Sequence, residues 1–277
     1  MAAPPIVQGL PYMVWVILVT LPIGNLAFVA LTRELSDAAR GYLGLSAITS
    51  AILAGLAVLV DTGLTPPGEL VIRMAEPTVA AVRQLALAAF ALLSLAYFFA
   101  LRGRLPVRTT AAAALAAGSI VLAAAAFGWA PTAPDAIPLL VQLVVLSAVT
   151  GGALAAIVLG HWYLVTPKLS ERPLVLQSRW LLAGISLQLS LFVVWTTLGG
   201  GPGQEEFEAL TGGAILLVGL RLVVSLVFPL VLTSMAMRTA QTRSMESATG
   251  LLYINLAAVM AGTIGAAALY FANGFLL

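Results

Sequence analysis

The chain has 277 residues, of which 61% are hydrophobic and only 9% are charged, and its mean hydropathy is +1.06. Soluble domains carry about 25% charged residues, so this chain lacks the polar surface that a protein needs in water on every side. It contains no cysteine, which excludes disulfides, thiolate metal sites, iron–sulfur ligation and covalent c-type haem attachment by its own residues.

Eight apolar stretches follow one another along the chain. A helix needs roughly 20 apolar residues to cross a hydrocarbon core of about 30 Å. The stretches are continuously apolar and do not alternate with period two, which excludes a transmembrane barrel. The predicted spans are 10–32, 41–61, 78–101, 110–129, 137–165, 174–198, 210–237 and 247–275. The predicted fold class is therefore an all-α polytopic membrane protein with eight transmembrane helices.

The basic residues collect at every second connector between spans. They are Arg33, Arg40, Arg102, Arg104, Arg108, Lys168, Arg172, Arg179, Arg238 and Arg243. The intervening connectors carry Arg73 alone among basic residues. Because Lys and Arg accumulate in cytoplasmic loops, both termini are expected outside, and the net charge of +2 indicates topology rather than a nucleic-acid partner. The abundance of Arg, Ala and Gly favours a GC-rich bacterial genome, and hence the cytoplasmic (inner) membrane.

The two halves of the chain carry similar motifs at similar spacings. The matched motifs, with their offsets, are Leu10-Pro11 and Ile137-Pro138 (127), Gly24 and Gly151 (127), Arg83 and Arg221 (138), and Ala117-Gly118-Ser119-Ile120 and Ala261-Gly262-Thr263-Ile264 (144). We interpret 1–136 and 137–277 as two four-helix repeats of one membrane domain. They would have the same orientation, related by an axis along the membrane normal. The alternative is a chance alignment of helices rich in Ala and Gly.

Arg83 is a charged residue that the pattern places inside the third span. It lies one to two turns from the outer edge of the third span. An arginine at this depth either extends its guanidinium to the interface or pairs with an acid, for which Asp61 and Glu76 are the candidates. Its match with Arg221 makes it a candidate cofactor-binding residue. No acidic residue is expected clearly within a span, which weakens the hypothesis of proton-driven transport.

His161 is the only histidine, and it lies in Gly160-His161-Trp162-Tyr163 near the inner end of the fifth span. It is a candidate metal ligand for haem b, a hydrogen-bond partner for a quinone, or a proton relay. The structural alternative is an interfacial histidine in an aromatic belt, where Trp and Tyr also collect. Because there is no second histidine, a bis-histidine haem within this chain is excluded.

Arg221 is the strongest candidate site residue, because it lies near the middle of the seventh span. We expect it roughly 17 Å from the outer end, at 1.5 Å per residue. An arginine at the bilayer centre costs about 2.5–3.5 kcal/mol on insertion scales, so something must compensate it. Either main-chain carbonyls and hydroxyls do so, or an anionic group of a cofactor or substrate does. Gln188 is the predicted neighbour in the sixth span, with hydroxyls from the fifth.

Three functions remain open on these residues. The first is a membrane-embedded subunit of an electron-transfer or haem- and quinone-handling system, with haem b or a quinone as cofactor. The second is a transporter of small anions or lipid-linked substrates, and the third is a cofactor-free structural subunit of a larger membrane complex. The expected partners are the lipid bilayer and other membrane subunits or further copies of the chain. Two fused four-helix bundles resemble haem A synthase and quinol-oxidising membrane anchors in architecture. The histidine pairs of haem A synthase are absent, so no residue role carries over.

Overall fold

The computed structural model describes residues 5–277 except 69 and 203, and the described part is helical without strands. Its elements are α1 (Pro5–Gln8), α2 (Leu10–Leu35), α3 (Arg40–Thr62), α4 (Pro77–Leu101), α5 (Val107–Trp129), α6 (Ala133–Val165), α7 (Arg172–Leu198), α8 (Glu208–Thr211), α9 (Ile215–Leu222), the π-helix η1 (Val223–Val227), α10 (Phe228–Gln241) and α11 (Met245–Asn273). In the described part, eight helices are long and apolar enough to cross a membrane, with α9, η1 and α10 forming one continuous span. The prediction of an eight-span, all-α membrane protein is confirmed.

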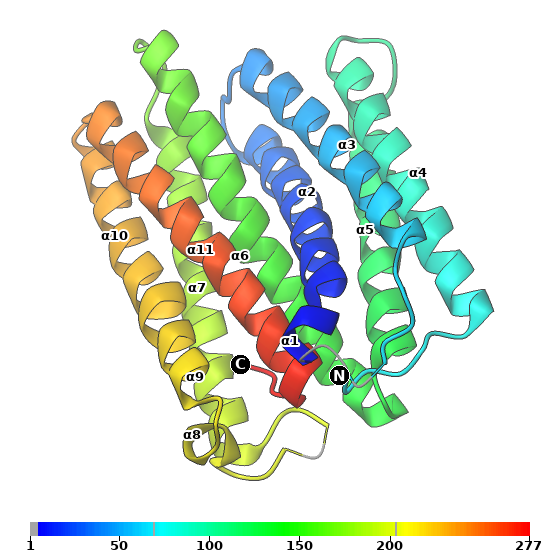
Figure 1. The fold of residues 1–277 in the computed structure, drawn as a ribbon. Coiled ribbons are helices and arrows are strands. Elements are labelled where there is room, and N and C mark those ends of the chain that lie inside the picture. The colour runs from blue at the N-terminus through cyan, green and yellow to red at the C-terminus, as the bar shows by residue number, and fades with distance from the viewer. Residues whose placement is uncertain (1–4, 69, 203) are drawn as a thin grey trace.

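The helices run between two ends of the bundle that differ in composition. Both chain termini lie at one end, which we call the termini end (Figure 1). The opposite end, which we call the arginine end, carries the connectors 36–39, 102–106, 166–171 and 242–244. The predicted alternation of basic and non-basic connectors therefore separates into two faces of one molecule.

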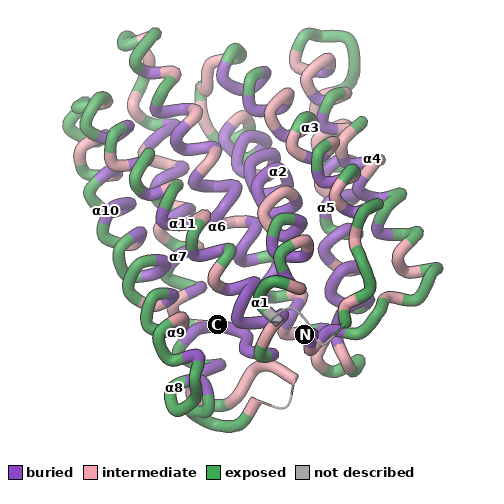
Figure 2. The backbone as a smooth tube through the Cα atoms, in the orientation of Figure 1, coloured by how far each residue is buried: buried purple, intermediate pink, exposed green. Residues whose placement is uncertain are grey.

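The two halves of the chain lie side by side and meet along α2 and α6. Helices α3, α4 and α5 lie on the α2 side, and α7, α10 and α11 lie on the α6 side (Figure 1). In the most apolar windows of α2 and α6, 72% and 78% of residues are buried, against 33% in α4 and α7. Buried residues line the facing sides of the helices, and exposed ones the outer sides (Figure 2). The central pair thus forms the core, and the outer helices present one face to lipid.

Glycine allows the central pair to approach closely. A β-carbon on Gly24 of α2 would overlap the carbonyl oxygen of Ser147 on α6. A β-carbon on Gly151 of α6 would overlap the backbone of Gly24 and Asn25 in return. In lipid, where no hydrophobic force drives helices together, small residues stabilise the contact by letting backbones pack at short range.

The seventh span begins later than the sequence pattern predicts. Gly212-Gly213 separates the short α8 from α9, so the span runs from Ile215 to Gln241. Arg221 lies six residues after Ile215, about 9 Å along the helix, and the predicted depth of 17 Å was wrong. The π-helix follows directly. Pro229 has no amide hydrogen, which frees the carbonyl of Ser225 four residues earlier and accounts for the wider turn there.

Candidate functional site

A buried ion pair at the termini end is the centre of the candidate site. Asp61 lies in the last turn of α3 and is 3% exposed, and Arg83 lies in the second turn of α4 and is 4% exposed. The Arg83 Nε lies 2.8 Å from Asp61 Oδ2 and Nη2 lies 3.2 Å from Oδ1, so both carboxylate oxygens are bonded. The pairing of Arg83 with Asp61 was one of the predicted alternatives. Asp61, which the sequence pattern did not place clearly within a span, lies inside the last turn of α3 and is buried.

Tryptophan surrounds this pair. The indole Nε1 of Trp15, a fully buried residue of α2, donates to Asp61 Oδ2 at 2.6 Å. The Arg83 guanidinium carbon lies 5.0 Å from the ring centroid of Trp129 and 5.8 Å from that of Trp15. Desolvated cation–π contacts of this kind stabilise a guanidinium by about 2 kcal/mol. Asp61 and Arg83 are thus held by α2, α3, α4 and α5 together.

The connector between α3 and α4 closes over the ion pair. The Tyr12 hydroxyl donates to the carbonyl oxygen of Thr65 at 2.7 Å. The amide of Arg73 donates to the carbonyl oxygen of Trp129 at 3.0 Å, and that of Val71 to the carbonyl oxygen of Phe271 at 3.2 Å. These bonds fix the connector against helices of both halves, so it forms a wall of the site rather than a free loop.

A pocket of about 170 Å³ lies between this connector and α4. It is lined by Tyr12, Asp61, Thr62, Leu64, Thr65, Pro66, Pro67, Met74, Ala75, Ala80, Arg83, Gln84 and Trp129. One nitrogen of the ion pair, Nη1 of Arg83, is buried and has no hydrogen-bond partner among the described residues. The pocket is therefore bounded by a carboxylate, a guanidinium and two aromatic side chains.

Arg221 is the second buried arginine at the termini end, and it has different partners. It is 2% exposed and thus faces the bundle interior. Its Nε donates to the main-chain oxygen of Leu277 at 3.2 Å, and Gln142 Nε2 donates to the same oxygen at 2.9 Å. Among the described residues, no aspartate or glutamate forms an ion pair with Arg221, and its Nη2 has no partner.

The other predicted site residues do not join this arrangement. Gln188 is 2% exposed on α7, and its Nε2 has no partner in the described structure. Gln188 was the predicted neighbour of Arg221, whose acceptor in the structure is instead the main-chain oxygen of Leu277. The hydroxyl of Thr150, predicted near Arg221, lies 2.7 Å from the Thr263 hydroxyl instead.

His161 lies on the outside of the bundle near the arginine end. Its ring is exposed, and Nδ1 lies 3.4 Å from the hydroxyl of Tyr253, itself 53% exposed. No group of three His, Cys, Asp or Glu residues that could hold a metal ion occurs in the described part of the chain. A haem bound by His161 would lie on the lipid-facing surface or against a partner, far from the two buried arginines at the termini end.

Sequence reasoning missed Tyr12, Trp15 and Trp129 as site residues. They lie in apolar spans where an aromatic residue is ordinary, and only the tertiary fold brings them to Arg83. A usable signal was present for Asp61, because an acid that ends one span and an arginine that begins the next lie at the same membrane depth.

Comparison with known proteins gives no relative: no protein-family model, no curated protein and no solved structure matches this chain.

Proposed function

We propose that the protein is a membrane-embedded, quinone-binding subunit of an electron-transfer system. The observation that carries the proposal is the buried Asp61–Arg83 pair at the wall of a small aromatic pocket, with one guanidinium nitrogen left over. Buried ionisable groups inside a membrane are expensive to maintain and are functional candidates by default.

The pocket suits a single-ring quinone head. Its volume of about 170 Å³ is below the roughly 300–1,000 Å³ of sites for drug-sized ligands, so it accommodates one ring and not a tetrapyrrole. A quinone carbonyl would accept a hydrogen bond from the Arg83 guanidinium, which lines the pocket, and the rings of Tyr12 and Trp129 would pack against the flat head. We therefore favour a quinone over haem b as the cofactor.

The proposed chemistry needs a partner subunit. Oxidation of a quinol to a quinone releases two protons and two electrons. The Asp61 carboxylate would accept a proton from a quinol hydroxyl, and water at the termini end would take the second. Both electrons would pass to a haem or iron–sulfur cluster of a neighbouring membrane subunit, since a chain without cysteine cannot ligate such a cluster itself.

We also infer that residues 1–136 and 137–277 are parallel repeats. The support is the pattern of neighbours, since α2, α3, α4 and α5 pack in succession as α6, α7, α10 and α11 do. Arg83 lies six residues after the start of α4, and Arg221 six after the start of α9. The distribution of arginines supports an orientation with both termini outside, in a bacterial inner membrane.

The transport alternative depends on two free guanidinium groups. Asp61 neutralises Arg83, which removes one of the two charges available to a translocated anion. The structural-subunit alternative makes a different prediction from the proposal, because a scaffold would bind no quinone.

The test is quinone binding to the purified protein in nanodiscs. Quenching of tryptophan fluorescence by a short-chain benzoquinone reports occupancy of the pocket, because Trp129 lines it. The double variant Asp61→Leu/Arg83→Leu removes the pair without leaving a lone charge, and should lose saturable quenching. The matched control is Arg221→Leu, which removes an equally buried arginine from the other half and should bind as the unmodified protein does.

Two outcomes would overturn the proposal. Absence of saturable quenching in the unmodified protein would favour the scaffold hypothesis. Equal binding by the Asp61→Leu/Arg83→Leu variant would show that the quinone site lies elsewhere. Far-ultraviolet circular dichroism and thermal unfolding of each variant establish that a loss of binding is not a loss of fold.

A further inference from the structure

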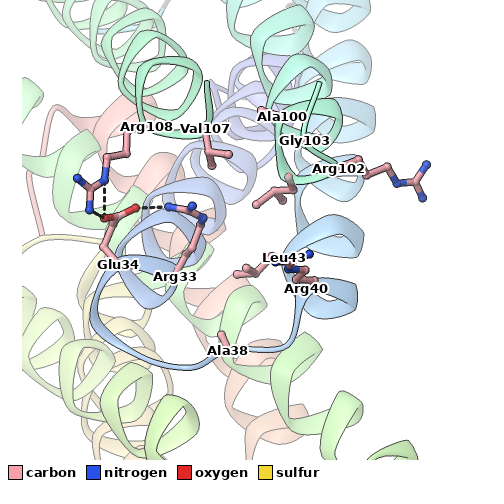
Figure 3. A pocket seen from close by; sticks show the side chains of 11 residues that line it. Arg33, Glu34, Ala38, Arg40, Leu43, Ala100, Arg102, Gly103, Val107 and Arg108 are labelled. Atoms are coloured by element: carbon pink, nitrogen blue, oxygen red, sulfur yellow. Dashed lines mark hydrogen bonds and ion pairs between the residues drawn. The ribbon is translucent and has the colours of Figure 1, made fainter. Parts of the chain in front are cut away.

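The arginine end of the first half carries a pocket that the proposed quinone site does not use. It has a volume of about 590 Å³ and lies where the α2–α3 and α4–α5 connectors approach each other (Figure 3). Four arginines and one glutamate line it, namely Arg33, Arg40, Arg102, Arg108 and Glu34. Sequence analysis interpreted these arginines as a topology signal alone, but the fold gathers them around one cavity.

The charges in this pocket do not balance. The Glu34 carboxylate is shared by Arg33 and by Arg108, whose Nε and Nη2 lie 2.9 Å and 2.7 Å from Oε2 (Figure 3). Among the described residues, no carboxylate forms an ion pair with Arg40 or Arg102. The pocket therefore keeps an excess of positive charge that an anion would neutralise.

An apolar hollow continues from this pocket toward the middle of the membrane. It has a volume of about 560 Å³, shares Arg40 and Arg102 with the pocket, and is lined further on by Leu45, Ile48 and Phe98. Ile48 lies eight residues after Arg40, which is about 12 Å along α3 and close to one leaflet of a hydrocarbon core about 30 Å thick.

Gly44 lines this hollow beside Phe98. A β-carbon at this position would lie 3.4 Å from the ring of Phe98, which is an ordinary van der Waals contact. A larger side chain here would extend into the space between α3 and α4. The combination of a cationic mouth and an apolar groove one leaflet long matches an amphipathic ligand.

We propose that this composite site binds a phosphate-bearing anionic lipid of the leaflet at the arginine end. The lipid phosphate lies between Arg40 and Arg102, whose planar guanidinium groups match phosphate oxygens, and an acyl chain lies in the groove beside Gly44. Basic pockets between transmembrane helices are a known chemistry for such headgroups. This inference is independent of the quinone site, which lies at the opposite end of the bundle.

The second half also carries arginines at the arginine end, but they do not gather around a comparable pocket. Its pocket at the same end is lined by a single arginine, Arg243, which forms an ion pair with Glu171 at 2.9 Å, and by Glu246. Exposed arginines also occur there, including Arg172 and Arg238. Arg172 and Arg238 therefore serve as control positions for Arg40 and Arg102, because they lie at the same end of the bundle.

Lipid retention tests the proposal. The protein is reconstituted in nanodiscs containing phosphatidylglycerol and phosphatidylcholine, released into detergent, and analysed for bound lipid by native mass spectrometry. The variant Arg40→Gln/Arg102→Gln should retain phosphatidylglycerol about tenfold to thirtyfold less well, from the usual contribution of two basic residues near an anionic lipid. The control Arg172→Gln/Arg238→Gln has the same change in net charge but lies outside the pocket and the hollow, so it should retain phosphatidylglycerol as the unmodified protein does.

The groove has its own test. Gly44→Leu should reduce retention of phosphatidylglycerol while leaving the binding of inorganic phosphate, measured by calorimetry, unchanged. Equal losses of phosphatidylglycerol from the two double variants would show that retention depends on surface charge in general, and would overturn the site. Undiminished lipid retention by Gly44→Leu, with full competition by inorganic phosphate, would identify free phosphate as the ligand and overturn the lipid assignment.

Discussion

The two buried arginines at the termini end differ in the groups that stabilise their charge. Each lies six residues into its helix, and each donates through Nε to an oxygen that a second side chain also bonds. For Arg83 the shared acceptor is the Asp61 carboxylate, and the second donor is Trp15. For Arg221 the acceptor is the main-chain oxygen of Leu277, and the second donor is Gln142.

The second donors also correspond in sequence. Trp15 and Gln142 are 127 residues apart, which is the offset of Gly24 and Gly151 at the central helix contact. The halves thus share an arrangement of donors and differ in the acceptor. The partner of a buried arginine is therefore not determined by its position alone, since Arg83 binds a side-chain carboxylate and Arg221 binds a main-chain oxygen.

The largest expected effect is the loss of the Asp61 carboxylate. Asp61→Leu leaves Arg83 buried without a counter-ion, which costs about 3–5 kcal/mol of stability. The double variant Asp61→Leu/Arg83→Leu should recover most of this loss, since an apolar pair of similar volume is often neutral in place of a buried ion pair. Thermal unfolding in one detergent measures both. Equal destabilisation by the single and double variants would contradict an energetically coupled pair.

The second donors provide a sharper comparison between the halves. Trp15→Phe removes a hydrogen bond to a charged acceptor and should cost about 1.5–3 kcal/mol, whereas Gln142→Leu removes a bond to a main-chain oxygen and should cost about 0.5–1.5 kcal/mol. The same unfolding measurement ranks them. A larger cost for Gln142→Leu would show that the acceptor at Leu277 is the more strongly charged of the two.

Arg221→Leu should have the smallest effect, within about 1 kcal/mol, because it removes a cation whose insertion in the membrane is itself costly. Arg83→Leu, the matched variant, leaves Asp61 without its counter-ion and should cost about 3 kcal/mol or more. Thermal unfolding of the two variants in the same detergent compares their stability costs. If Arg221→Leu proves as harmful as Arg83→Leu, then Arg221 also has an anionic partner and the contrast between the centres fails.

Much of the architecture follows from short-range properties of the chain. The number of spans follows from the length of the apolar stretches, and the two faces of the bundle follow from the alternation of arginine along the connectors. The error in the seventh span came from Gly212-Gly213, since two glycines between apolar residues hardly change a hydropathy pattern but do end a helix. Both arginines are buried, although for Arg83 the sequence left open whether its guanidinium extends to the interface or pairs with an acid.

The partners of those residues were decided only by the tertiary structure. Asp61 meets Arg83 through helices that adjoin in sequence, so their pairing could be anticipated as one of two choices. Trp15, Trp129 and Leu277 reach the arginines through contacts between helices far apart in the chain, and no local pattern reports such contacts. The number of spanning helices, and the presence of a cation inside the seventh span, follow from local properties, because hydrophobic length and helical rise are local. The oxygen that each cation binds depends on how all the helices pack, and that is a property of the whole fold.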